Sequence, residues 1–249
     1  MTKLEAEIFV IRASSFKLRH SPEFMVTLLS ILLLGFFLGM RHATDCDHVV
    51  AVTTIVSRQR SLGSAALTGI FWGIGHSLTL LVVGGAIIFF GIVIPERLGL
   101  GLEFCVALML ILLGALNVRS AMRSLRGDDE ESEADTQLDR IFGRVKWYGA
   151  VRPLIIGVVH GLAGSAAVAL LVLPIIQRPI WAWAYLLVFG LGTVAGMMLM
   201  TTTIAVPITY TARFKFFRHH LATVAGVLSL GFGLFLAYQI GIVNGLFTR

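Results

Sequence analysis

The sequence predicts an all-α protein, a polytopic membrane bundle of six or seven transmembrane helices, arranged as a 3+3 inverted repeat with a broken first helix. Three observations support this fold class. Hydrophobic residues make up 57% of the 249 residues and charged residues only 14%, against about 25% charged residues in soluble domains. Several apolar segments reach the length of about 20 residues that crosses a bilayer. The two halves of the chain also share short similar stretches.

The first region, residues 24–56, is too long for one ordinary span and too polar in its middle for two, so we expect it to tilt, break or re-enter. The remaining apolar segments are predicted to be single spans: 65–94, interrupted by Gly73, Gly75, His76 and Ser77, and then 98–118, 154–176, 181–206 and 221–243. Arginine and lysine gather in alternate loops, which places those loops in the cytoplasm. The basic residues before Phe24 also favour the inside, and they would require a seventh crossing. We therefore expect an integral protein of a bacterial inner membrane.

An internal repeat divides the chain. The stretch that ends at His42 resembles the one that ends at His160, and two later pairs of Gly-containing stretches match at nearly the same offset. An odd number of helices per half gives the halves opposite topology, which is typical of secondary transporters with a site near the midplane. The predicted organisation is an N-terminal tail (1–23), a first helical repeat (24–120), an acidic cytoplasmic loop (121–150) and a second helical repeat (151–249).

Four ionisable residues stand between two apolar runs: His42, Asp45, Asp47 and His48. Charge at membrane depth is costly and usually marks an ion or substrate path. Imidazole with carboxylate suits divalent nickel, cobalt or zinc. On one continuous helix, Asp47 and His48 would lie about 140° and 120° around the axis from His42, so we expect an unwound turn at residues 43–47.

Further candidate ligands lie in and beyond this stretch. Cys46 could add a soft thiolate, and His76 and Ser77 could face the first cluster because neighbouring glycines allow close helix approach. His160 occupies the repeat-related position of His42. Glu103 and Asn117 lie near helix ends, where capping or interface contacts explain them equally well. The alternative for the first cluster is a salt bridge of Arg41 with an aspartate, plus capping of two half-helices.

The stretch Arg41-His-Ala-Thr-Asp-Cys-Asp-His48 resembles the His-x4-Asp-His signature of the nickel/cobalt transporter family, and Gly75-His76-Ser77 resembles its second motif. The resemblance implies that the metal is recognised by these residues: His42, Asp45, Asp47, His48 and His76, with Ser77 in a lesser role. Cys46 differs from the small residue usual between the aspartates. The larger members also carry an acidic motif in a later helix, whereas residues 157–161 contain no carboxylate. The chain therefore looks most like the smaller, urease-accessory, UreH-like branch.

These observations together predict an inner-membrane permease, not an enzyme, that moves Ni²⁺ or Co²⁺ as its substrate and needs no cofactor. The expected partners are the metal ion, the lipid bilayer and nickel-enzyme maturation proteins. Nucleic acid is not expected despite the net charge of +6, because no soluble domain carries a basic surface. The residues leave three alternatives open: an exporter of metal or of a small sulfur-containing anion, a membrane-embedded metalloenzyme, and a metal-sensing or docking protein without transport.

Overall fold

The computed structural model describes residues 22–57, 59, 61–91, 95–125, 148–162, 179–211 and 215–248. Within these ranges all regular structure is helical, which confirms the predicted fold class. The helices are α2 (Pro22–His42), α3 (Cys46–Val56), α4 (Leu62–Phe90), α5 (Glu96–Leu125), α7 (Tyr148–Gly161), α9 (Pro179–Thr211) and α10 (Lys215–Tyr238), which ends in the π-helical turn η3 (Gln239–Val243).

Four of the described helices (α4, α5, α9 and α10) are long and apolar enough to cross a membrane, and the bent pair α2–α3 would make a fifth span. The acidic loop and much of the predicted 154–176 span lie outside the described residues, so the number of crossings stays a prediction. The prediction of one helix over residues 65–94 is confirmed, although α4 runs without a break from Leu62 to Phe90 and ends four residues earlier than expected. Its glycines allow close contact with neighbouring helices.

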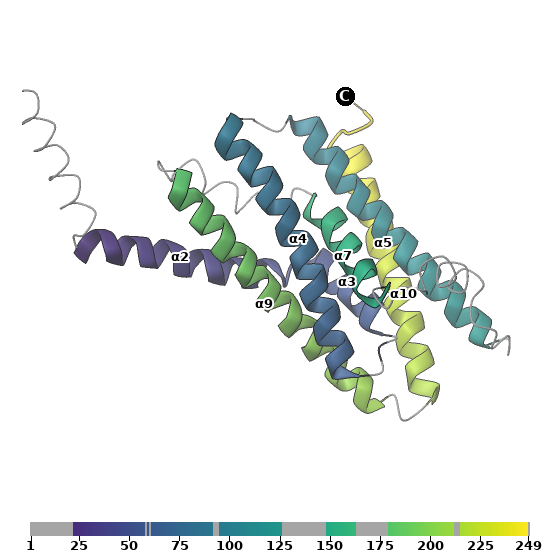
Figure 1. Cartoon of the computed structure of the whole chain (residues 1–249). Helices are drawn as coiled ribbons and strands as arrows, with labels where there is room; N and C mark the ends of the chain where they lie inside the picture. Colours follow the sequence, from purple (N-terminus) through teal and green to yellow (C-terminus); the bar gives the residue numbers. More distant parts are fainter. Residues whose placement is uncertain are drawn as a thin grey trace, which may run out of the picture.

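Each of the main helix pairs joins a helix from the first half of the chain to a helix from the second half. Helices α4 and α9 lie side by side at the centre, α5 pairs with α10, α2 crosses α9, and the short α7 lies against α4 (Figure 1). If α2 corresponds to α7, α4 to α9 and α5 to α10, every one of these contacts maps onto itself or onto another in the set. This pattern is the one that related halves would produce, and the repeat boundaries themselves stay a prediction.

Glycines on both partners bring the crossing helices together. A Cβ on Gly39 would collide with the backbone of Phe189 on α9, and a Cβ on Gly157 would collide with the backbone of Trp72 on α4. Such small-residue contacts let backbones approach closely where lipid removes the hydrophobic drive for helix association. The close approach of α7 to α4 brings His160 to the helix that carries His76.

The bundle exposes large apolar side chains and buries several polar ones within its apolar core. Large apolar side chains such as Phe37, Val82 and Leu191 are more than half exposed. Histidine and hydroxyl side chains are buried instead, which follows when the surrounding solvent is hydrocarbon. The structure therefore supports an integral membrane protein whose apolar core contains buried histidine and hydroxyl groups.

Candidate metal site

The break between α2 and α3 brings the first candidate ligands, His42 and His48, together. Helix α2 ends at His42, α3 begins at Cys46, and the two axes are bent by 56°. Tight turns hold the connection, since the Thr44 amide donates to the Arg41 carbonyl at 2.8 Å. The predicted unwinding is confirmed, but it covers only residues 43–45. Asp47 and His48 already lie in the first turn of α3.

The first ligand group joins α2, α3 and α4. The imidazoles of His42, His48 and His76 are 7%, 0% and 0% exposed. One nitrogen from each lies within 4.8 Å of the others, and His42 Nε2 and His76 Nε2 are 2.9 Å apart. The unbroken α4 therefore carries His76 onto the residues at the helix break.

The second ligand group joins α3 to the other half of the chain. His160 Nε2, on α7, lies 2.9 Å from Asp47 Oδ2, and His48 Nδ1 lies 3.3 Å from Asp47 Oδ1. These three side chains also place one ligand atom each within 4.8 Å of the others. His48 belongs to both groups, so the two sites are adjoining rather than separate.

Several imidazole nitrogens in these groups have no hydrogen-bond partner among the described residues. They are Nε2 of His48, Nδ1 of His76 and Nδ1 of His160. An unsatisfied buried polar atom costs about 1–3 kcal/mol, and such atoms in native proteins call for an explanation. A bound divalent ion would supply a partner for imidazole lone pairs here.

The other predicted site residues take different places. Asp45 lies in neither group, and its Oδ2 accepts from His42 Nδ1 at 2.8 Å. Ser77 donates its hydroxyl proton to the Gly190 carbonyl on α9 at 3.0 Å, so it joins helices rather than facing the histidines. Cys46 is exposed. Arg41 is exposed and forms no ion pair with either aspartate, so the alternative of an arginine–aspartate bridge is not what the structure has.

One neighbour of the cluster was missed in the sequence. Trp72 is fully buried, with ring centroids 6.0 Å from His48 and 5.6 Å from His160. It stands four residues before His76 and therefore shares its helix face. That spacing was the available signal, because it places a large ring beside His76 on one face of α4.

No family model and no solved structure matches the chain. The urease accessory protein UreH of Bacillus sp. is 41% identical over 224 residues, which cover 89% of this chain and 96% of that protein. The high-affinity nickel transport protein of Cupriavidus necator is 28% identical over 70% of this chain and 58% of its own length. That of Cryptococcus neoformans is 36% identical over 61 residues, which cover 24% of this chain and 12% of that protein.

Proposed function

Because this chain belongs to the UreH-like branch of the nickel/cobalt transporter family, we propose that it is a bacterial inner-membrane permease for divalent transition-metal ions, with Ni²⁺ as its first substrate and Co²⁺ as its second. Its relatives are named for nickel transport and for urease assembly rather than for catalysis. The metal is therefore cargo, and proteins that mature nickel enzymes would be the expected partners that receive it.

The observation that carries this proposal is the sharing of His48 between two buried ligand groups. An ion bound by His42, His48 and His76 could pass to Asp47, His48 and His160 by exchanging the other ligands around His48. It would keep an imidazole ligand throughout, so no step would strip it of all protein ligands in the low-dielectric interior.

The spacing of the nitrogens is compatible with a transition metal. Metal–imidazole bonds are about 2.0–2.1 Å long, so two nitrogens at a right angle on one ion would be about 2.9 Å apart. His42 Nε2 and His76 Nε2 have this separation. Right-angled ligands are typical of square-planar and octahedral ions, of which Ni²⁺ is one.

Asp45 supports the ligand role of His42 from outside the cluster. If His42 Nδ1 carries the proton that is donated to Asp45 Oδ2, then Nε2 keeps its lone pair and faces His76. A carboxylate that fixes the tautomer of a ligating histidine also raises its basicity. We therefore assign Asp45 a positioning role and give Asp47 the role of the direct carboxylate ligand.

The ligands come from both halves of the chain, as alternating access requires. His42, Asp47, His48 and His76 stand in the first half, and His160 stands in the second. Rocking of one half against the other would change the distance between His160 and Asp47 and so open or close one of the two groups. Transporters built from repeats place their substrate sites at such an interface.

A transport assay tests this proposal. Purified protein in liposomes should accumulate Ni²⁺, with competition by Co²⁺ exceeding that by Zn²⁺ or Mn²⁺. His42→Ala should abolish accumulation, whereas His220→Ala, on the exposed surface of α10, should leave it unchanged. Normal transport by the His42→Ala protein would contradict the site. Tight binding of Ni²⁺ without release into the lumen would favour the metalloenzyme alternative.

A further inference from the structure

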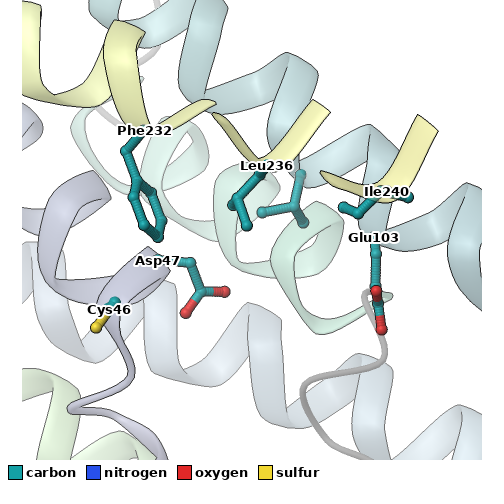
Figure 2. A pocket seen from close by; sticks show the side chains of 7 residues that line it. Cys46, Asp47, Glu103, Phe232, Leu236 and Ile240 are labelled. Atoms are coloured by element: carbon teal, nitrogen blue, oxygen red, sulfur yellow. The ribbon is translucent and has the colours of Figure 1, made fainter. Parts of the chain in front are cut away.

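A pocket of about 230 Å³ opens beside the buried cluster, between α3, α5 and α10 (Figure 2). Apolar side chains form most of its wall. Its complete lining is Cys46 and Asp47 from α3, Glu103 and Val106 from α5, Phe232 and Leu236 from α10, and Ile240 from η3. A pocket that is mostly apolar with a few convergent polar groups is the usual form of a small-ligand site.

Asp47 is a wall of this pocket and a member of the second ligand group at the same time. One carboxylate oxygen lies 2.9 Å from His160 Nε2 and the other 3.3 Å from His48 Nδ1. Both histidine side chains are 0% exposed, whereas that of Asp47 is 17% exposed. Nε2 of His48 and Nδ1 of His160 have no hydrogen-bond partner among the described residues. The pocket therefore leads through the Asp47 carboxylate to imidazoles that each keep one nitrogen without a partner in the described ranges.

Glu103 faces the same pocket from α5, across from Asp47 (Figure 2). It lies about two turns inside α5, beyond the first turn where a carboxylate can cap a helix or benefit from its dipole. No basic side chain in the described ranges pairs with it. The structure thus removes the capping explanation that the sequence left open and places a second carboxylate, which forms no ion pair with the described residues, in the wall of the pocket that Asp47 lines.

We propose that this pocket is the port through which a hydrated divalent ion reaches or leaves the histidine cluster, and that Glu103 holds the ion there opposite Asp47. The proposal rests on the proposed function and adds to it an outer ion position and a residue that serves it. About six waters, at about 30 Å³ each, fit within the 230 Å³ of the pocket. The ion would lose waters one at a time as Asp47, and then His160 and His48, replace them.

Two carboxylates in the wall of an otherwise apolar pocket would also favour cations over anions. Field lines from Glu103 and Asp47 are focused by low-dielectric walls, which raises the local concentration of a divalent cation. A sulfur-containing anion would meet two negative charges here. The port therefore also argues against the anion alternative.

The two cysteines of the chain offer a direct test of the port. Cys46 lines the pocket, whereas Cys105, also exposed, lies on α5 outside it. In the Cys105→Ser protein, a small hydrophilic thiol reagent should modify Cys46, and Ni²⁺ should slow that modification at least about tenfold. In the Cys46→Ser protein, Ni²⁺ should not change the rate at Cys105. Modification of Cys46 that is indifferent to saturating Ni²⁺ would overturn the port.

The role of Glu103 is tested by the Ni²⁺ concentration that gives half-protection of Cys46. Glu103→Gln should raise it about tenfold, which corresponds to about 1.4 kcal/mol, and Glu103→Asp should restore most of the loss. Glu96→Gln, at the exposed start of the same helix, is the matched control and should have no effect. Equilibrium Ni²⁺ binding to the histidine cluster, measured by calorimetry, should stay within about twofold in all three variants.

The outcomes separate this inference from the function on which it rests. If the wild-type protein binds and transports Ni²⁺ but Glu103→Gln behaves like Glu96→Gln, the port assignment is wrong and the permease proposal stands. If the wild-type protein neither binds nor transports Ni²⁺, the proposed function fails first. A Glu103→Gln protein with a lowered melting temperature and normal half-protection would show a merely structural residue and also overturn the port.

Discussion

The contact between α4 and α7 should control metal affinity even though no ligand is altered. A Cβ on Gly75 would lie 3.1 Å from the backbone nitrogen of Val158 and closer still to the carbonyl oxygen of Leu154. Both neighbours are backbone atoms, so no side chain can turn away. Non-bonded heavy atoms prefer about 3.5–4.0 Å, and Gly75→Ala would therefore push α7 away from α4 by about 1 Å.

That displacement is large on the scale of the ligand geometry. His160 belongs to α7, and its Nε2 lies 2.9 Å from Asp47 Oδ2. A shift of α7 by about 1 Å would therefore break this contact. Metal–ligand distances tolerate only about 0.2 Å. Disturbing the support of a metal site typically costs about 10–100-fold in affinity, which is about 1.4–2.8 kcal/mol.

The same helix supplies the control. A Cβ on Gly63 would meet nothing within 4 Å, so Gly63→Ala should carry only the gain in helix propensity, about 1 kcal/mol. Both variants are measured by Ni²⁺ calorimetry on purified protein and by thermal unfolding. Gly75→Ala should lose affinity while Gly63→Ala keeps it. Equal Ni²⁺ affinity in the two variants would refute the claim that close α4–α7 packing positions His160.

Three other changes follow from the same geometry. His48→Ala should lower Ni²⁺ affinity at least about 100-fold. The loss should exceed that of His76→Ala, because His48 belongs to both ligand groups. Equal losses in a calorimetric titration would argue against a shared ligand. Asp45→Asn should cost about tenfold in the same titration, because Asp45 orients His42 from outside, and a loss as great as that of His48→Ala would make it a direct ligand. Asn117→Ala should lower the free energy of unfolding by about 1 kcal/mol, because this buried amide donates to an α10 carbonyl at 3.0 Å. Its Ni²⁺ affinity should be unchanged. An unaltered denaturation curve would show that the bond contributes nothing to stability.

Local sequence determined the fold class and the kinds of ligand. Composition and segment length indicated membrane helices, since both depend on the bilayer as solvent. The position of the helix break also followed from the sequence, because His42 and His48 cannot converge on one straight helix. The glycines of α4 were correctly expected to allow close approach of other helices within one continuous span. A transmembrane helix tolerates glycine because its backbone hydrogen bonds are all made within the helix.

The tertiary structure alone decided how these groups combine. His160 meets Asp47 across more than a hundred residues of chain, and only the packing of α7 on α4 brings them within 2.9 Å. His48 lies in both candidate ligand groups because residues of three other helices converge on it, which no spacing along one helix can encode. Glu103 is assigned to a pocket for the same reason. Periodicity reports which face of a helix a residue occupies, whereas the partner of that face depends on which helices the folded chain places beside it.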